Sequence, residues 1–366
     1  MSKPLDILVV TPRLNIAGVS LAQQRFARAL ARAGHRVTLM IGNVDEGLAL
    51  PDFKGVRTVV VGRRRAVGMF GPIARYLRKE RPDVVFSAED HLNTLVLLAA
   101  LVTRSTAKIS GSSRVTPFDT YSNKPLTKRW VLKHLARSVA WRADALTCVS
   151  KDMVEQYRRV FRDPKHQAVY NIVDDAASRA RIAEPVDDPW LNDKTHPVLV
   201  AVGSLQPWKG FATLIDAIAI LRTRGREVRL IILGEGPQRA ELEERVAALG
   251  LGGRIRLPGH RANPLAYFAR ADASVLSSTV EGMPNVLVEA MLAGCTPVAT
   301  DCPTGPRELL GDGRYGYLAT VGDSASIADA IERALDTPIA KEMLAEAVRP
   351  FEESTVIARH FELLGL

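Results

Sequence analysis

The sequence contains few cysteines and no long hydrophobic run. Its three cysteines, Cys148, Cys295 and Cys302, are scattered and have no spacing typical of a metal site or a disulfide framework. No apolar segment approaches the roughly 18 residues that span a membrane. The first ten residues lack the apolar core and the small-residue cleavage site of a signal peptide. We therefore expect a reduced, cytoplasmic protein without a metal site built from cysteine and histidine.

Aromatic residues are also scarce, at 6% of the chain, and they do not cluster with basic residues. Proteins that bind single-stranded nucleic acid usually interleave aromatic rings with positive charge. The composition therefore gives little support to a nucleic-acid partner, and none is expected.

Positive charge, in contrast, is abundant and uneven. Residues 1–150 contain 24 lysine and arginine residues and 10 aspartate and glutamate residues, a net charge of +14. Because the whole chain has a net charge of +9, the remaining residues have a net charge of −5. A basic first part indicates an anionic partner for that part, such as a membrane surface. The alternative is a generally arginine-rich protein with no such partner.

The length and the apolar pattern predict two α/β domains. A chain of 366 residues exceeds one typical core. The order of strand 6–10, helix 19–33 and strand 36–40 is a βαβ unit, which predicts a parallel sheet. The alternation resumes at a strand over 197–203. We expect a first domain over 1–175, a linker over 176–196, a second domain over 197–350 and a final helix within 351–366.

The stretch from Ser277 to Gly305 carries the strongest motif. It predicts a turn between two short strands that leads into a helix, with Glu281 before the turn and Glu289 inside the helix. A helix N-terminus offers backbone N–H groups and partial positive charge to an anion. Carboxylates are good acceptors for sugar hydroxyl groups. Alternatively, both glutamates are solvent-facing charges.

The segment EGMPNVLVEAMLAGCTPV, residues 281–298, resembles the donor-site signature of retaining glycosyltransferase family 4, whose members have the GT-B fold. The resemblance implies two Rossmann-like domains with parallel sheets that face an interdomain cleft. It implies that Glu281 contacts the transferred sugar, that Glu289 contacts the nucleotide ribose, and that the amides between them hold the diphosphate. The donor-binding residues implied here are Glu281, Gly282, Met283, Pro284, Asn285, Val286, Leu287 and Glu289.

The resemblance implies further donor contacts elsewhere in the chain. One is Gly18, at the end of the loop that starts at Arg13. Three follow the first strand of the second domain, namely Gly203, Ser204 and Lys209. The last three form the loop Gly259, His260 and Arg261. Lys209 is expected to neutralise the leaving diphosphate. The family usually has an arginine where this chain has Ser204. Either Arg261 or Arg13 replaces that cation, or Lys209 acts without a cationic partner.

Acceptor contacts are expected in the first domain. The stretch SAEDHLNT, residues 87–94, is predicted to form a loop after a strand, where doubly wound sheets bind ligands. The candidates for the acceptor side are Arg13, Asp90, His91, Asn93 and Arg114, with Glu89 beside them. His91 is also a candidate catalytic residue, although a single histidine in a loop is more often only solvated. The stretch 108–113, where relatives often place a histidine or an acid, has neither.

Residues 127–142, TKRWVLKHLARSVAWR, predict a helix with basic and aromatic edges. Such a helix suits an anionic membrane interface. It equally suits a packed helix with a solvated basic side. The resemblance favours the membrane, because many relatives act on lipid-linked acceptors at the inner face of the cytoplasmic membrane.

These observations predict a metal-independent, retaining hexosyltransferase that uses no cofactor. The donor is expected to be a UDP-linked hexose or N-acetylhexosamine, since the loop 302–308 resembles that of relatives that transfer N-acetylhexosamines. The acceptor is expected to be a glycan or a lipid-linked glycan of the cell surface. The alternatives are an epimerase or phosphorylase of the same fold, or a basic binding protein without catalysis.

Overall fold

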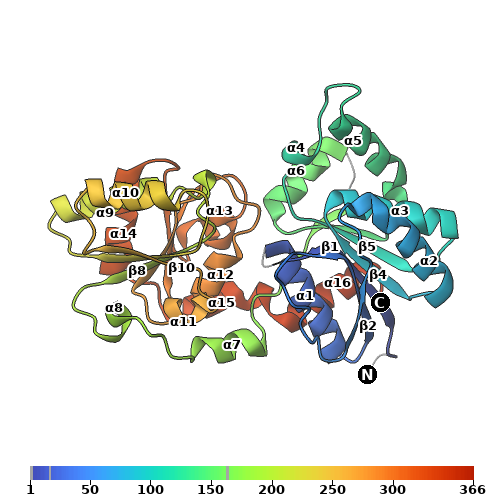
Figure 1. Ribbon diagram of the computed structural model, residues 1–366, viewed down its shortest axis with the longest axis horizontal. Helices are drawn as coiled ribbons and strands as arrows, with labels where there is room; N and C mark the ends of the chain where they lie inside the picture. Colours follow the sequence, from blue (N-terminus) through green and yellow to red (C-terminus); the bar gives the residue numbers. More distant parts are fainter. Residues whose placement is uncertain (1–2, 16–17, 162–164) are drawn as a thin grey trace. The chain divides into compact units, whose positions relative to one another are not determined.

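The computed structural model describes residues 3–15, 18–161 and 165–366, so residues 16 and 17 of the predicted loop before Gly18 lie outside the described residues. The chain forms two compact units (Figure 1). Unit 1 comprises Met1–Ile172 and Glu353–Leu366, and unit 2 comprises Val173–Glu352. Each unit contains a parallel sheet, so the prediction of two α/β domains is confirmed.

Unit 1 is built on a sheet of strand order β3-β2-β1-β4-β5-β6-β7. The order reverses between β1 and β4, and crevices at the carboxyl ends of strands at such a switch point bind ligands. The strands are β1 (Asp6–Leu14), β2 (Arg36–Val44), β3 (Val56–Val60), β4 (Val84–Ala88), β5 (Lys108–Ser113), β6 (Ala145–Cys148) and β7 (His166–Ala168). The helices are α1 (Gly18–Arg32), η1 (Ala66–Met69), α2 (Phe70–Glu80), α3 (Asp90–Thr103), α4 (Pro117–Thr120), α5 (Lys128–Val139), η2 (Ala140–Arg142), α6 (Lys151–Phe161) and α16 (Glu353–Leu364).

Unit 2 repeats this plan with the order β10-β9-β8-β11-β12-β13, which reverses between β8 and β11. The strands are β8 (Val198–Val202), β9 (Arg229–Leu233), β10 (Ile255–Gly259), β11 (Ala273–Leu276), β12 (Thr296–Thr300) and β13 (Tyr317–Ala319). The helices are α7 (Ala176–Ile182), α8 (Pro189–Asn192), η3 (Pro207–Lys209), α9 (Phe211–Thr223), α10 (Arg239–Ala248), α11 (Pro264–Phe268), α12 (Asn285–Leu292), α13 (Pro306–Leu309), η4 (Gly311–Gly313), α14 (Ser324–Asp336), α15 (Lys341–Val348) and η5 (Arg349–Phe351).

Burial explains why these segments are strands and helices. All five residues of β4 and of β12 are buried, as is typical of parallel strands covered on both faces. Helix α9 buries Leu214, Ile218 and Leu221, the stripe that its sequence predicts. Strand β7 ends at Ala168, and Val173 and Asp174 donate backbone hydrogen bonds to the carbonyl oxygen of Phe351.

The residues predicted as a linker, 176–196, contain α7 and α8 and are grouped with unit 2. Trp190 of α8 lies between Arg229 and Arg256, whose guanidinium carbons are 5.2 and 5.0 Å from its ring centres. Asp188 caps the helix and also contacts Arg256 at 3.3 Å. Cation–π contacts of this kind stabilise the segment against β9 and β10.

The C-terminal helix α16 is grouped with unit 1, although the chain reaches it from unit 2. His360 of α16 packs against Phe26 of α1 and Phe86 of β4, with ring centres 4.8 and 5.4 Å apart. Arg32 of α1 pairs with Glu353 at the start of the helix. These contacts make α16 part of the core of unit 1.

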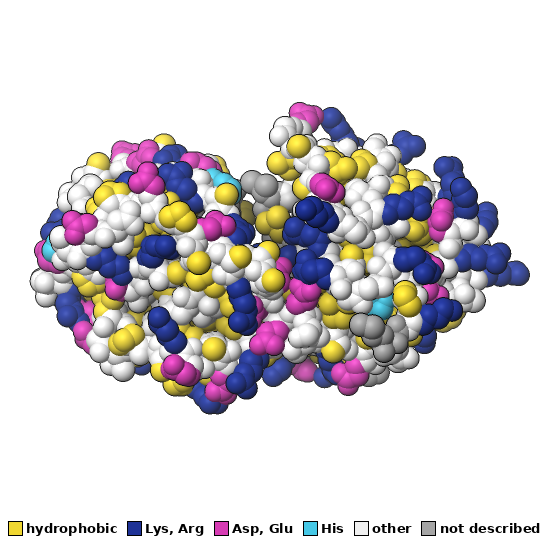
Figure 2. Space-filling view, turned by 90° about the horizontal axis from the view of Figure 1, so that it is seen from below, with side chains coloured by type: hydrophobic (Ala, Val, Ile, Leu, Met, Phe, Trp, Pro, Cys, Tyr) yellow, Lys and Arg dark blue, Asp and Glu magenta, His cyan; other side chains and the backbone are white. Residues whose placement is uncertain are grey.

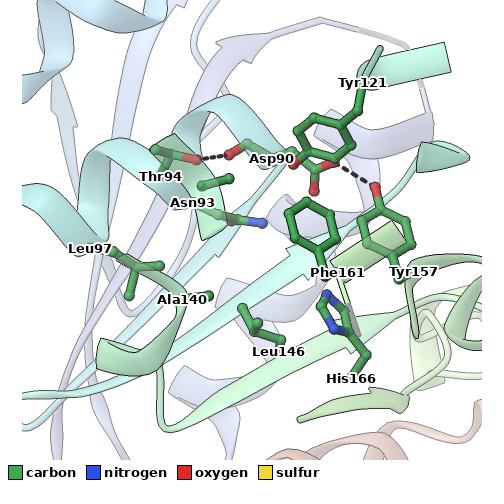
Figure 3. A pocket seen from close by; sticks show the side chains of 11 residues that line it. Asp90, Asn93, Thr94, Leu97, Tyr121, Ala140, Leu146, Tyr157, Phe161 and His166 are labelled. Carbon is green, nitrogen blue, oxygen red and sulfur yellow. Dashed lines mark hydrogen bonds between the residues drawn. The ribbon is translucent and has the colours of Figure 1, made fainter. Parts of the chain in front are cut away.

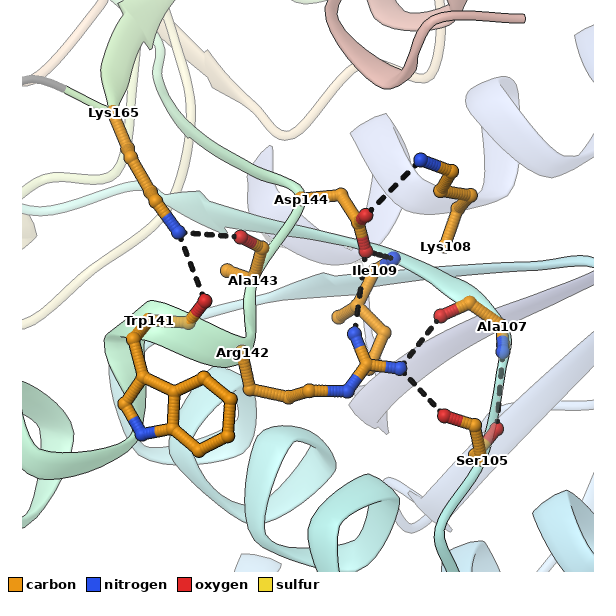
Figure 4. A network of polar contacts seen from close by, with 9 residues as sticks. All are labelled: Ser105, Ala107, Lys108, Ile109, Trp141, Arg142, Ala143, Asp144 and Lys165. Carbon is orange, nitrogen blue, oxygen red and sulfur yellow. Dashed lines mark hydrogen bonds and ion pairs between the residues drawn. The ribbon is translucent and has the colours of Figure 1, made fainter.

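A polar network fixes the C-terminal end of α5 and η2 to the sheet (Figure 4). Arg142 donates to the carbonyl oxygens of Ser105 and Ala107 at 2.7 and 2.9 Å and pairs with Asp144 at 3.3 Å. Lys165 donates to the carbonyl oxygens of Trp141 and Ala143 at 2.9 and 3.0 Å. These bonds satisfy carbonyl groups that the end of the helix leaves open.

Candidate active site

In unit 2, the loops after β8 and β11 bring Lys209 and Glu281 into contact at the switch point of the sheet. Lys209 Nζ donates to Glu281 Oε1 at 2.6 Å, and Ser278 Oγ donates to the same oxygen at 2.6 Å. The two charged side chains are 19% and 11% exposed, so solvent screens this ion pair far less than a surface pair. The pair is thus fixed in position yet open to a ligand.

The two loops are held together through their backbones. Ser277 Oγ donates to the carbonyl oxygen of Lys209, and the amide of Thr279 donates to that of Trp208, both at 2.8 Å. Gly210 has φ of 66°, and a Cβ added there would lie 2.1 Å from the carbonyl oxygen of Ser277. A glycine is therefore required for the loops to approach this closely.

The helix after Glu281 begins where the motif predicts. Helix α12 starts at Asn285, and its N-cap residue Pro284 makes no side-chain capping hydrogen bond. Thr304 donates its hydroxyl to the carbonyl oxygen of Glu281. A Cβ at Gly305, where φ is 93°, would lie 2.6 Å from Cδ of Pro284. The loop at 304–305 therefore buttresses the turn that presents the N-terminus of α12, an arrangement suited to an anion.

Glu289 lies inside α12, about one turn from its start. One detail of the predicted motif changes. The amide of Leu287 donates to the carbonyl oxygen of Pro284 at 2.9 Å, so it is already used within the helix. Gly282, Met283, Asn285 and Val286 are partly exposed, whereas Pro284 is buried.

The other predicted donor residues lie at the carboxyl ends of β8 and β10. Ser204 is exposed beside Gly203, whose carbonyl oxygen would be 1.8 Å from a Cβ at Gly234. His260 and Arg261 are exposed after Gly259, and Arg261 Nε donates to the hydroxyl of Tyr267 at 3.2 Å. Within the described residues, no cation besides Lys209 contacts Glu281.

In unit 1, a groove of about 510 Å³ lies at the carboxyl ends of β1 and β4. Its lining residues include Arg13, Arg64, Arg65, Glu89 and His91. The groove therefore occupies the switch point of the sheet, where a ligand is expected. Gly18 is exposed at the start of α1, and a Cβ there would meet no atom within 4 Å.

Glu89 turns the chain directly from β4 into α3, so the predicted loop over 87–94 is wrong. Its backbone is in the left-handed region, with φ of 78°, which is strained for a residue other than glycine. Its amide donates to the carbonyl oxygen of Ser112 at 3.0 Å, and its carboxylate lies 3.3 Å from His91 Nε2. Burial raises the pKa of Glu89 and lowers the pKa of His91, and both shifts disfavour the charged forms.

Asp90 and Asn93 are buried and line a small pocket together with Tyr121, Tyr157 and Phe161 (Figure 3). The Asp90 carboxylate accepts hydrogen bonds from Ser113 and from Tyr157, and burial raises its pKa. Asn93 accepts from Ser87 at 2.7 Å and donates to the carbonyl oxygen of Ser112 at 3.0 Å. The direct turn at Glu89 sends these two side chains inward, where they hold α3 against the sheet. Neither lines the groove that Glu89 and His91 line.

Arg114 is also largely buried. It donates to Asn171, and burial lowers its pKa to about 10, while the nearby Glu89 carboxylate opposes that shift. Arg114 therefore interacts electrostatically with Glu89 without lining the groove. Arg13, in contrast, is exposed on the groove itself.

Several residues of these sites were not predicted. Ser278 and Thr304 donate hydrogen bonds to Glu281, and Arg64 and Arg65 line the groove of unit 1. The position of Ser278, three residues before Glu281, was the signal that could have identified it. Among the described ranges, no group of three His, Cys, Asp or Glu side chains is arranged to hold a metal ion.

Two family models match the chain. The model described as "Glycosyl transferases group 1" matches residues 148–350, and the one described as "Glycosyl transferase 4-like domain" matches residues 17–171. Together the two models cover most of both units.

Several similar sequences with curated functions are glycosyltransferases. The alpha-D-kanosaminyltransferase of Streptomyces kanamyceticus is 31% identical over 231 residues, which are 62% of this chain and 58% of that protein. The lipopolysaccharide core biosynthesis glycosyltransferase LpsE of Rhizobium meliloti (strain 1021) is 32% identical over 195 residues, 52% of this chain and 54% of that protein. The chain thus spans little more than half the length of these relatives.

Solved structures share the whole fold. Anabaena Alr3699/HepE in complex with UDP has a TM-score of 0.77 at 21% identity, over 99% of this chain and 100% of that chain. The lipopolysaccharide outer core galactosyltransferase WaaB, in its apo form, has a TM-score of 0.75 at 17% identity, over 98% of both chains. The prediction of the GT-B fold is confirmed.

Proposed function

Because the chain belongs to the group 1 glycosyltransferases, we propose that it transfers a sugar from a nucleotide donor bound by unit 2 to an acceptor bound by unit 1. The donor is a UDP-linked hexose or N-acetylhexosamine, and the reaction retains the anomeric configuration. The acceptor is a glycan or a lipid-linked glycan of cell-surface polysaccharide synthesis. The UDP bound to HepE and the polysaccharide roles of relatives such as LpsE support this choice.

The Lys209–Glu281 pair beside the N-terminus of α12 is the observation that carries the proposal. A lysine and a helix N-terminus together suit a diphosphate, and the partly buried carboxylate suits the hydroxyl groups of the sugar attached to it. Glu289 takes the ribose, and the segment from Gly282 to Val286 takes the phosphates. Gly203, Ser204 and the loop from Gly259 to Arg261 complete the nucleotide site.

The charges account for catalysis. As the bond from sugar to diphosphate breaks, negative charge grows on the leaving phosphate and positive charge on the sugar ring. Lys209 and the α12 amides stabilise the negative charge on the phosphate, and Glu281 stabilises the positive charge on the sugar ring. Fixed charged and polar groups of this kind supply much of the rate enhancement of enzymes. The leaving phosphate oxygen then accepts the proton of the attacking hydroxyl on the same face. His91 and Glu89 orient the acceptor, and no metal is required.

A membrane surface is the proposed location of the acceptor. The exposed apolar side chains Leu126, Val131, Leu135 and Trp141 lie in or beside α5, and residues 120–143 contain six lysine or arginine residues and no acid. Apolar side chains flanked by cations suit an anionic lipid interface. Figure 2 shows that dark blue predominates over magenta at the unit 1 end of the face drawn. Among the described residues, no helix is long and apolar enough to cross a membrane.

A thermal-shift panel of UDP, GDP, ADP and their sugar derivatives tests the donor site. A ligand that binds only the folded state raises the Tm. We expect a shift with UDP and UDP-sugars that Glu289→Ala removes and that Glu244→Ala, an exposed change on α10, retains. The absence of a shift with every nucleotide would contradict the proposal. NMR of the product with a UDP-sugar then tests retention, and activity in EDTA tests the independence from metal.

A further inference from the structure

The groove of unit 1 has two chemically different parts. Glu89 and His91 lie at the carboxyl end of β4, and Arg13 is in β1. Arg64 and Arg65 come from the loop before η1. Its volume of about 510 Å³ falls within the range of small-molecule sites and suits a sugar with a further group attached.

The positive charge of this groove is not balanced inside unit 1. Three guanidinium groups line it against a single carboxylate, that of Glu89. Arg64 pairs with Glu46 at 3.0 Å, but the side chains are 80% and 92% exposed, so this pair contributes little. In the part of the chain that the structure describes, no acidic side chain lies within ion-pair distance of Arg13 or Arg65. A neutral sugar would not need this excess of two positive charges.

The geometry at Glu89 indicates a ligand at the opposite part of the groove. The left-handed backbone of Glu89 presents its carboxylate beside His91, where both can hydrogen-bond to a hydroxyl group. Strained residues held by well-determined surroundings are common at ligand sites. Asp90 supplies that support from within the core, through Ser113 and Tyr157.

We propose that the acceptor is a sugar phosphate or sugar diphosphate, with its phosphate held by Arg13, Arg64 and Arg65 and its sugar hydroxyl held by Glu89 and His91. Guanidinium groups bind phosphate with two parallel hydrogen bonds, which makes arginine suited to this role. The assignment of the groove to the acceptor rests on the proposed transferase function. The phosphate chemistry of the groove rests on its charges alone.

Binding of inorganic pyrophosphate to the full-length protein tests this assignment. UDP is kept at saturation, so that unit 2 is occupied, and the affinity is measured by titration calorimetry at low salt. We expect Arg64→Ser/Arg65→Ser to weaken pyrophosphate binding by tenfold or more. Arg75→Ser/Arg78→Ser, which removes the same charge from exposed positions on α2, should leave the affinity unchanged.

Farnesyl diphosphate and methyl α-glucoside form the other two arms. Tighter binding of farnesyl diphosphate than of pyrophosphate, with the same dependence on Arg64 and Arg65, assigns the phosphate to a lipid carrier. Equal binding of the two assigns it to phosphate alone. Methyl α-glucoside should bind equally to both double variants. Pyrophosphate binding that is absent, or that is equal in both double variants, overturns the inference.

The UDP titration separates the two claims. If UDP binds and pyrophosphate binding is indifferent to Arg64 and Arg65, the transferase proposal stands and the phosphate subsite is wrong. If no nucleotide binds and pyrophosphate binding still depends on these arginines, the proposed function fails while the anion groove remains.

Discussion

The two units place their candidate ligand sites at equivalent points of similar sheets but build them differently. In unit 2 the charged groups contact one another directly, through Lys209 and Glu281, and glycine allows their loops to meet. In unit 1 the partly exposed pair Glu89 and His91 lies next to a buried polar network centred on Asp90. The site of unit 2 is formed mainly by contacts between loops, and the site of unit 1 rests on buried core residues. Substitutions should therefore affect the two sites differently.

The largest expected effect is on the ion pair of unit 2. Glu281→Gln and Lys209→Ala should each lower turnover by roughly a hundredfold or more, as removal of one transition-state contact does. Lys209→Ala should also lower the Tm, because it leaves the largely buried Glu281 carboxylate without its partner. Lys341→Ala, a charge change at an exposed position of unit 2, is the control. Steady-state kinetics with a UDP-sugar measure the effect, and rates near wild type in both variants would remove these residues from the site.

Glycine substitutions contrast the two units next. Gly210→Ala forces a side chain into left-handed backbone and against the carbonyl oxygen of Ser277. We expect a loss of about 1–3 kcal/mol of stability and a loss of donor affinity, because Lys209 must move. Gly18→Ala meets open space in a helix, so its free energy of unfolding should stay within about 0.5 kcal/mol of wild type.

Urea denaturation measures the stability of both glycine variants, and a UDP titration measures their donor affinity. Reduced donor affinity in a fully stable Gly18→Ala would support the predicted contact of Gly18 with the donor. Unchanged stability and affinity in Gly210→Ala would contradict the loop packing described for unit 2.

Acidification should act mainly on unit 1. Burial lowers the pKa of His360 to about 3, so the unfolded chain takes up a proton below pH 6.5 that the folded unit does not. Stability from this group is complete above pH 6.5 and falls as the pH approaches 3, by about 2 kcal/mol between pH 7 and pH 5. The described histidines of unit 2, His196 and His260, are not buried.

Denaturation of wild type and His360→Leu at pH 7 and pH 5 measures this difference. The leucine variant should lose less stability on acidification than wild type. An equal loss in both would show that other groups set the pH dependence of unit 1.

The smallest expected effects distinguish residues of unit 1 that stabilise the fold from residues that contact the acceptor. Tyr157→Phe removes a hydrogen bond to the buried Asp90 and should cost about 1–2 kcal/mol of stability. Tyr317→Phe in unit 2 removes an exposed bond to the carbonyl oxygen of Thr337 and should cost less. Glu89→Gln should instead raise the KM for acceptor while the Tm is kept. A stability loss in Glu89→Gln larger than that in Tyr157→Phe would reverse these roles.

The turn and helix around Glu281 in unit 2 could be predicted from the sequence because their residues are contiguous. The turn at Gly282 to Asn285 and the start of the next helix follow from local chain preferences, and both are confirmed. The contact between Lys209 and Glu281 joins residues 72 positions apart and depends on the backbone approach at Gly210. Local pattern alone does not specify such a contact.

The start of α3 in unit 1 was harder to predict because one backbone angle, that of Glu89, decides it. A loop over 87–94 would have exposed Asp90, His91 and Asn93 alike, but the left-handed turn at Glu89 starts α3 one residue later. In the helix, His91 then faces the groove, whereas Asp90 and Asn93 face the core. Left-handed backbone at a glutamate has no sequence signal, since the preference of glycine or asparagine is missing there.

Titration of UDP into wild type and Lys209→Ala tests the central claim most directly, namely that Lys209 and the N-terminus of α12 form a nucleotide diphosphate site. The account predicts binding of UDP by wild type and an affinity at least tenfold lower in Lys209→Ala, with uridine binding both proteins equally. Equal affinity of UDP for the two proteins would contradict it.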